Sequence, residues 1–157
     1  MLTATKMQAN EPLLPVAHAT LVKFGYPRTL VHQGQHWAVL VRPAQPTLGS
    51  LVLCALADKT AYGDLPAAAF AEQAALVGRI EQLLRGFVSY EKVNYLMLMM
   101  VDPHVHFHVL PRYNGTRTFE GHEFLDPGWP GLPDFSKNQV ASATLIEAIK
   151  LGWQSLS

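Results

Sequence analysis

Short apolar runs separated by turn residues predict three β-strands in the first third of the chain. Residues 29–31 and 37–41 are two such runs, and the polar residues 33–35 between them favour a hairpin turn. A third apolar run covers residues 51–54, after a stretch rich in proline. We therefore expect three short strands before residue 60.

A helical period follows at residues 64–86. Asp64 is a good N-cap residue, Pro66 suits the first turn, and Gly86 suits the end of a helix. Apolar residues recur at intervals of three or four, as an amphipathic helix requires. This predicted buried stripe consists of Phe70, Ala74, Val77, Ile80 and Leu84.

Two more strands are predicted in the centre of the chain. Residues 95–101 are apolar on both faces, which favours a fully buried strand that ends at Asp102 and Pro103. In residues 104–110, histidine alternates with apolar residues, the pattern of a strand with two unlike faces. Because the turn between the two runs is so short, we expect them to pair antiparallel.

The last part of the chain predicts an ordered loop and a helix. Residues 113–135 are rich in Gly, Pro and aromatic residues, while Ser136 and Gln139 have the spacing of a capping box. The residues expected to point inward from this helix are Val140, Leu145, Ile149 and Trp153.

The element order predicts an α+β fold: a single antiparallel sheet of about five strands, with a long helix after the third strand and a C-terminal helix. Residues 1–20 show no period and predict a loosely ordered arm, and residues 21–157 a single domain.

Composition and charge narrow the function classes. The 157 residues are 49% hydrophobic, with a formal net charge of zero and no basic stripe, which argues against a nucleic-acid groove binder. A single cysteine, Cys54, excludes a disulfide within the chain and suggests a reducing compartment. The sequence shows neither a signal peptide nor an apolar run near the roughly 20 residues of a membrane helix. We expect a cytoplasmic protein that does not bind membranes or nucleic acids.

Three of the seven histidines, His104, His106 and His108, lie on one strand face. Neighbouring side chains on such a face are about 6.5–7 Å apart, so two could share a zinc ion, with a third ligand from elsewhere. Alternatively, the three histidines form a solvent-facing row without a function. A third use is phosphate chemistry, because neutral imidazole carries a lone pair near pH 7 and can attack phosphorus. His106, with a histidine on each side, is then the best candidate nucleophile, provided that a carbonyl holds its other N–H.

One segment resembles the signature of the histidine triad superfamily, His-φ-His-φ-His-φ-φ with φ apolar. This segment is His104-Val105-His106-Phe107-His108-Val109-Leu110. A looser resemblance extends over residues 25 to 131, including a Trp-Pro pair at residues 129–130. The resemblance implies a nucleotide-binding α+β fold, commonly a homodimer with a sheet that continues across the interface. It implies hydrolysis or transfer at the α-phosphate of a nucleoside 5′-phosphate derivative. We expect neither a cofactor nor a metal. His106 matches the residue that becomes nucleotidylated, His108 one that contacts the α-phosphate, and His104 one that orients the centre.

Three departures from the family pattern concern substrate recognition. Ser50 follows Gly49 where family members usually carry a fourth histidine, and a hydroxyl is no general acid at neutral pH. Only Asp102 and Pro103 stand where many members have a longer Gly-rich loop, and Val41 and Arg42 stand where many have an Asp or Asn for the ribose.

The remaining candidate substrate-binding residues are Ser50, Arg112 and Trp129. Ser50 could donate a hydrogen bond, Arg112 could reach a phosphate or instead brace a loop, and Trp129 could contact a base or pack under its own loop. The leading hypothesis is a nucleotide hydrolase or nucleotidyl transferase that works through His106. Alternatives are a nucleotide-binding or regulatory module with little or no catalysis, and a metal-binding protein that uses two of the histidines.

Overall fold

A five-stranded antiparallel sheet forms the centre of the protein. The computed structural model describes residues 11–156, and the strands lie in the order β1-β2-β4-β6-β5. Every neighbouring pair in this sheet is antiparallel. The strands are β1 Leu30–Gln33, β2 Trp37–Val41, β4 Leu51–Ala55, β5 Lys92–Leu96 and β6 His106–Arg112. The predicted α+β class with a sheet of about five strands is confirmed.

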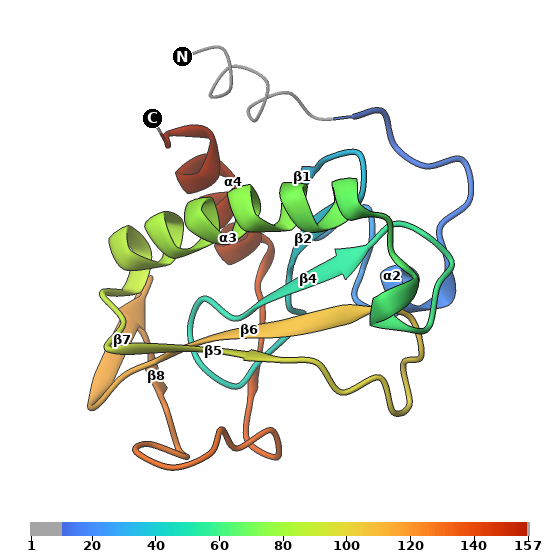
Figure 1. The fold of residues 1–157 in the computed structure, drawn as a ribbon. Helices are drawn as coiled ribbons and strands as arrows, with labels where there is room; N and C mark the ends of the chain where they lie inside the picture. The colour runs from blue at the N-terminus through green and yellow to red at the C-terminus, as the bar shows by residue number, and fades with distance from the viewer. Residues whose placement is uncertain (1–10, 157) are drawn as a thin grey trace.

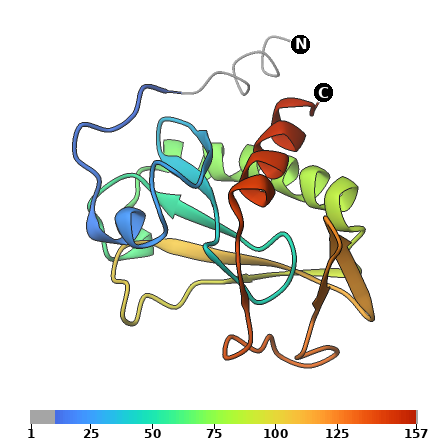
Figure 2. The same ribbon diagram turned by 180° about the vertical axis from the view of Figure 1, so that it is seen from behind.

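Two helices cover one face of the sheet. Figure 1 shows α3, Ala67–Val88, lying across this face with α4, Ala143–Gln154, beside it. Buried apolar residues from both helices and from the facing side of the strands form one large core cluster. The other face carries a smaller buried cluster, covered by residues 14–26 with the short helix α2, Ala19–Lys23. Figure 2 shows the long loop before α4 passing on the side of the sheet away from α3.

The long helix begins later than predicted. Asp64 is the last residue of a 3-10 turn, η1 Tyr62–Asp64, and the N-cap of α3 is Pro66. Leu65 is extended, with φ −77° and ψ 146°, because the ring of a following proline disfavours helical backbone. The helix continues past Gly86 to Val88, where Ser89 in the left-handed region ends it.

The buried side chains of α3 differ in part from the predicted stripe. Ile80 and Leu84 are buried as predicted, whereas Phe70 is 37% exposed. The observed buried face consists of Ala69, Leu76, Ile80, Leu83, Leu84 and Val88. The predicted stripe was therefore correct only in the second half of the helix.

The prediction of a fully buried strand over residues 95–101 is wrong. The strand is β5, Lys92–Leu96, and it lies at the edge of the sheet with half-buried side chains. The apolar residues that follow are outside any strand, and Met100 and Val101 are 83% and 86% exposed. Apolar residues on both faces predicted a strand, but this pattern could not distinguish a central strand from an edge strand.

Two small sheets were not predicted. Within residues 113–135, β7 Thr116–Phe119 and β8 His122–Leu125 form a hairpin through Glu120 and Gly121, both with positive φ. The strands β3, Ala44–Gln45, and β9, Gln139–Val140, pair antiparallel.

The C-terminal helix also begins later than predicted. Its N-cap is Ser142, whose hydroxyl accepts a hydrogen bond from the Leu145 N–H, whereas Ser136 donates to Asp134. Val140 belongs to β9 and is 84% exposed, so it is not an inward residue of the helix. The inward positions Leu145, Ile149 and Trp153 are buried as predicted.

Residues 11–20 differ from the loose arm that the sequence suggests. The Glu11 N–H donates to the Gln33 carbonyl, the Gln33 side chain donates to the Pro12 carbonyl, and Thr20 is 1% exposed. These contacts place the segment against the sheet, where Leu14 and Ala17 pack on the smaller cluster. Residues 1–10 of the predicted arm lie outside the described residues.

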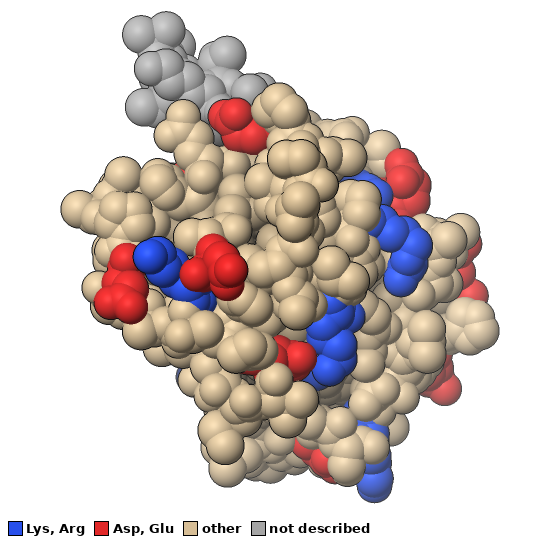
Figure 3. Space-filling view, turned by 90° about the vertical axis from the view of Figure 1, so that its right-hand side faces the viewer, with Lys and Arg blue, Asp and Glu red and all other residues tan. Residues whose placement is uncertain are grey.

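The surface carries charges of both signs. On the face in Figure 3, Lys and Arg side chains lie interspersed with Asp and Glu, without a large area of one sign. Within residues 11–156, no helix combines the length and apolar character needed to cross a bilayer.

Glu72 on α3 holds the turn of the first hairpin. Its carboxylate accepts hydrogen bonds from the backbone N–H groups of Gln35, His36 and Trp37, at 2.9, 3.0 and 2.9 Å. A Cβ atom at Gly34 would lie 2.6 Å from this carboxylate, so a side chain there would have to push the Glu72 carboxylate aside. The hairpin is thereby fixed against the start of α3.

Replacing Glu72 with glutamine is expected to lower the free energy of unfolding by about 1–3 kcal/mol. The amide replaces one acceptor oxygen with a donor, so at least one backbone N–H loses its partner. Urea unfolding of the purified variant measures this loss. Glu147→Gln, at an exposed position of α4, is the matched control and should change stability by less than about 0.5 kcal/mol. Equal effects of the two variants would contradict the assignment.

Candidate active site

The three histidines lie on the face of the sheet opposite α3. His106 pairs with Cys54 and His108 with Val52, and directly paired residues of antiparallel strands point to the same face. Cys54 and Val52 belong to the smaller buried cluster, whereas Val105 and Val109 belong to the large core. The predicted alternation of the two faces is therefore present, although His104 lies just before β6 rather than in it.

A backbone carbonyl fixes the ring of His106. Its Nδ1 atom is 2.6 Å from the carbonyl oxygen of His104. A carbonyl only accepts hydrogen bonds, so Nδ1 carries a proton and, in the neutral ring, Nε2 carries the lone pair. The carbonyl needed to hold this ring comes from the same chain segment, two residues earlier. The nitrogen left free is suited to attack an electrophile.

Hydrogen bonds on both sides hold His104. The Thr20 hydroxyl lies 2.8 Å from Nδ1, and an Asp58 carboxylate oxygen lies 2.8 Å from Nε2. The His104 N–H donates to the Thr20 oxygen at 3.3 Å, so the hydroxyl proton is available to Nδ1 and the Nε2–H donates to Asp58. The ring of His18 stacks on His104 with a centroid distance of 3.9 Å, and its Nε2 lies 2.8 Å from the Ala55 carbonyl oxygen. These contacts fix the residue whose carbonyl orients His106.

His108 is enclosed by aromatic side chains and one arginine. The rings of Phe24 and Phe135 meet it edge to face at 5.6 and 5.5 Å, and Arg42 Nε lies 3.3 Å from its Nδ1. Burial is the main cause that lowers the pKa of His108 to about 4, and the positive charge of Arg42 lowers it further. His108 is therefore neutral at pH 7.

The histidine face is closed in this structure. His104, His106 and His108 are 8%, 2% and 6% exposed. Phe24, the residue after α2, packs on both His106 and His108, and Phe135 reaches His108 from the loop before α4. These two aromatic side chains therefore cover part of the histidine face.

The hydroxyl of Ser50 is used within its own turn. Ser50 is fully buried, and its hydroxyl donates to the Thr47 carbonyl at 2.7 Å and lies 3.0 Å from the Thr47 hydroxyl. Ser50 precedes Leu51, which pairs with Val109, whereas His104 precedes the other end of β6. Ser50 and His104 therefore lie toward opposite ends of the β4–β6 pair. The substrate-binding role of Ser50 stays a prediction.

Arg112 braces a loop, the second of the two roles weighed for it. Its guanidinium donates to both Asp126 oxygens at 2.6 and 3.0 Å, to Asn94 at 2.7 Å and to the Gly131 carbonyl at 2.9 Å. Only 3% of Arg112 is exposed, so its phosphate-binding role is not supported by this geometry. Trp129 lies with Arg112 in the wall of a hollow of about 430 Å³ whose lining includes none of the three histidines.

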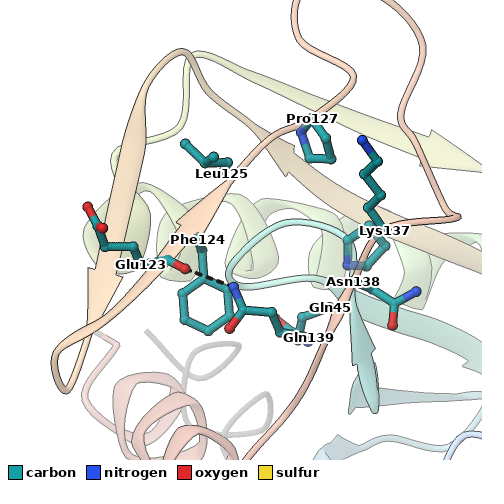
Figure 4. Close-up of a pocket in the computed structure, with 9 residues that line it drawn as sticks. Gln45, Glu123, Phe124, Leu125, Pro127, Lys137, Asn138 and Gln139 are labelled. Carbon is teal, nitrogen blue, oxygen red and sulfur yellow. Dashed lines mark hydrogen bonds between the residues drawn. The ribbon is translucent and has the colours of Figure 1, made fainter.

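Another hollow, of about 250 Å³, lies between β8 and β9 (Figure 4). Its lining includes Phe124 and the polar residues Glu123, Lys137 and Asn138. The Gln139 side chain crosses it to donate to the Glu123 carbonyl at 2.8 Å. The triad histidines are not among its lining residues.

No group of three or more His, Cys, Asp or Glu side chains within residues 11–156 is arranged to hold a metal ion. Cys54 is a buried free thiol, and burial raises its pKa well above the usual range. At the triad, the neutral His106 ring keeps a lone pair on Nε2, and the His108 ring lies beside it on the same face. Such an arrangement suits a phosphate group.

Three residues from other elements hold the histidines; the sequence pointed to neither Thr20 nor Asp58, and it named Arg42 only as a departure from the family pattern. Thr20 and Asp58 lie 84 and 46 residues from His104, and Arg42 lies 66 residues from His108. None of them stands in a motif, and Thr20 fell in the segment predicted as a loose arm. Thr20 comes from α2, Arg42 from the end of β2 and Asp58 from the loop after β4, so only the folded arrangement of these elements brings them to the site.

Neither a family model nor a curated protein sequence matches the chain, but solved structures do. A histidine triad protein from Sinorhizobium meliloti superposes with a TM-score of 0.69 at 18% identity, over 88% of this chain and 93% of that one. A histidine triad protein from Bradyrhizobium japonicum gives 0.64 at 18% identity, over 90% and 96%. The diadenosine triphosphate hydrolase of Plasmodium falciparum, in complex with cyclomarin A, gives 0.61 at 14% identity, over 94% and 89%. The chain therefore has the fold of histidine triad proteins, as its resemblance to the triad signature implied.

Proposed function

We propose that this protein hydrolyses or transfers a nucleotidyl group through a covalent intermediate on His106. The observation that carries the proposal is the hydrogen bond from Nδ1 of His106 to the His104 carbonyl, which leaves the lone pair on Nε2. This lone pair attacks the α-phosphorus, and the bond from phosphorus to the leaving group breaks with its electrons on the leaving group. Water or another acceptor then attacks phosphorus, and the electrons of the phosphorus–nitrogen bond return to Nε2.

The neighbouring histidines have supporting roles in this proposal. His108 lies 5.0 Å from His106 between ring centroids, on the same face, and would contact a phosphate oxygen. His104 is tied to Thr20 and Asp58 and would keep the carbonyl in place that orients His106. The fold supports the proposal, because one structural neighbour with it is a diadenosine triphosphate hydrolase.

The first test is turnover of a small substrate panel by the purified protein. The panel contains adenosine and guanosine phosphoramidates, dinucleoside polyphosphates and adenylyl sulfate, which differ in leaving group but share an α-phosphate. We expect release of a nucleoside monophosphate from at least one compound, together with an acid-labile nucleotidyl adduct in intact-protein mass spectrometry. Absence of both, with nucleotide binding retained, would contradict the enzymatic proposal.

A second candidate function is a nucleotide-binding or regulatory module with little turnover. It is favoured by Ser50, which replaces a histidine and whose hydroxyl is engaged with Thr47, and by the closed histidine face. The same panel separates the two functions, because a module binds nucleotide without producing monophosphate. Ser50→His would then be the first variant to test for a gain of turnover.

We also propose that two copies associate through the edge of the sheet at β5. This edge strand is followed by the apolar residues Leu98, Met100 and Val101, which are 50%, 83% and 86% exposed. An open strand edge beside exposed apolar side chains is suited to pairing with a second copy around a twofold axis.

Light scattering is expected to give a mass of twice 17.3 kDa for the wild-type protein. The double variant Met100→Lys, Val101→Lys should shift the protein to the monomer mass, because charges at both positions oppose burial in the interface. Leu151→Lys, at an exposed apolar position of α4, is the control and should remain dimeric. A wild-type monomer at all concentrations would refute the proposed dimer.

The cytoplasm remains our proposed location. It rests on the single cysteine, which is buried and reduced here, and on the nucleotide chemistry proposed above. Fractionation of cells that express a tagged full-length chain would test it.

A further inference from the structure

Arg42 occupies a defined position beside the triad. It follows β2 directly, and its Nε lies 3.3 Å from Nδ1 of His108. Its Nη1 donates to the Ala44 carbonyl at 2.5 Å, and its guanidinium lies 5.2 Å from the centre of the Phe135 ring. Two hydrogen bonds and one aromatic contact therefore hold the guanidinium on three sides. No such arginine belongs to the triad signature by which the sequence was interpreted.

The contact with Arg42 decides the protonation of the His108 ring. A guanidinium nitrogen is always a donor, so Nδ1 of His108 must accept and cannot carry a proton. The neutral ring then carries its proton on Nε2. For His106 the arrangement is the reverse, because Nδ1 donates to a carbonyl and Nε2 is free. The two neighbouring rings thus offer a lone pair from one Nε2 atom and a proton from the other.

We propose that Arg42 is a positioning residue that fixes His108 as the tautomer with its proton on Nε2. The inference rests on the proposed function, because it assigns this N–H to the phosphate that His106 attacks. The positive charge of the guanidinium also disfavours protonation of His108, because the resulting imidazolium and Arg42 would repel each other. His108 would then act as a neutral hydrogen-bond donor to phosphate, held in that state by a residue outside the triad.

The electrostatics around His108 agree with this geometry. The charged or titratable groups that act on it are Arg42 from the end of β2, His106 from β6 and Asp102 from the preceding turn. Arg42 and His106 disfavour the imidazolium, and Asp102 favours it. Burial, followed by Arg42, lowers the pKa of His108 to about 4. Loss of the Arg42 charge is therefore expected to raise the pKa of His108, although burial will keep it below the usual 6.5.

The direct test is nitrogen NMR of the histidine rings in the ligand-free full-length protein. Long-range ¹H–¹⁵N spectra distinguish protonated from unprotonated ring nitrogens. At pH 7 we expect a protonated Nε2 and a bare Nδ1 for His108, and the opposite for His106. A protonated Nδ1 on His108 would overturn the inference. This measurement needs neither substrate nor a variant.

Two variants then separate the charge of Arg42 from its planar donor. Arg42→Met removes both, so the pKa of His108 should rise and its ring should become a mixture of tautomers. Arg42→Lys restores the charge without the planar Nε–H, so the pKa should stay low while the mixture of tautomers persists.

Arg85→Met, at an exposed position of α3, is the matched control and should leave His108 unchanged. Should Arg42→Met not fold, Phe135→Leu removes the aromatic contact of the guanidinium and is expected to shift His108 in the same direction by less.

Activity adds a second readout. In Arg42→Met we expect kcat/KM to fall roughly tenfold to hundredfold, the usual effect of removing a group that orients a functional histidine. The acid limb of the pH–rate profile should move to higher pH, because His108 becomes protonated more readily. An unchanged tautomer and titration of His108 in Arg42→Met would refute the role of Arg42, even if turnover fell. If no substrate is turned over, the NMR result still decides the role of Arg42, whereas the proposed function alone fails.

Discussion

Replacing His106 with alanine is expected to abolish the nucleotidyl adduct and to lower turnover at least about a thousandfold. The substitution removes the Nε2 atom of His106, whose lone pair is left free because Nδ1 is bound to the His104 carbonyl. His108 is a poor substitute, because the nitrogen that faces the same side carries a proton in the tautomer set by Arg42. Intact-protein mass spectrometry measures the adduct, and steady-state assays on the best panel compound measure turnover.

The control for His106→Ala is His122→Ala. His122 lies exposed on β8, and its loss should leave adduct and turnover unchanged. Because His106 is buried, near-ultraviolet circular dichroism should accompany the assay to show that the variant is folded. An adduct of the same mass in His106→Ala would assign the nucleophile to another residue. Turnover without any adduct in the wild type, even in rapidly quenched samples, would favour direct attack by water.

The features of the site that depend on local sequence could be predicted. Alternation of histidine with apolar residues fixed which side chains share a face, and the same alternation placed Val105 and Val109 in the core. The choice of His106 followed from its central position, and its carbonyl-bound ring agrees with that choice. Strand periodicity is a local property, because neighbouring side chains point to opposite faces whatever the rest of the chain does.

The groups that tune the histidines could not be predicted, because they come from distant segments. Thr20 and Arg42 reach the triad from α2 and from the end of β2, and neither stands in a recognisable motif. Residues 97–101 were misjudged for a related reason. A run that is apolar on both faces fits a central strand, but only the order of strands reveals that this run leaves the sheet at its edge.

Arg112 shows why a residue's type does not settle its role. An arginine just past a histidine strand suits a phosphate, and the sequence could equally place it in a loop brace. In the structure, Asp126 lies 14 residues away across the β7–β8 hairpin and takes two of its N–H groups. Since the hairpin itself was not predicted, the partner of Arg112 could not be identified from the sequence.

Replacing Asp126 with alanine is expected to cost about 3–5 kcal/mol of unfolding free energy. Arg112 and Asp126 are 3% and 8% exposed, so the variant would leave a buried guanidinium without its counter-charge. Asp126 also accepts from the Tyr113 N–H at 3.3 Å, a second bond that would be lost. Urea unfolding followed by circular dichroism measures the difference.

The matched comparison is Asp102→Ala, which breaks the ion pair with Lys23 at 3.2 Å. The Lys23 side chain is 56% exposed, and a pair so open to water contributes less than about 1 kcal/mol. The double variant Arg112→Met, Asp126→Leu removes both buried charges together and should recover most of the stability lost in Asp126→Ala. If the double variant is no more stable than the single one, the cost does not come from an unpaired charge but from packing of the loop at residues 126–131. If Asp126→Ala and Asp102→Ala cost the same, burial of the Arg112 pair contributes nothing measurable.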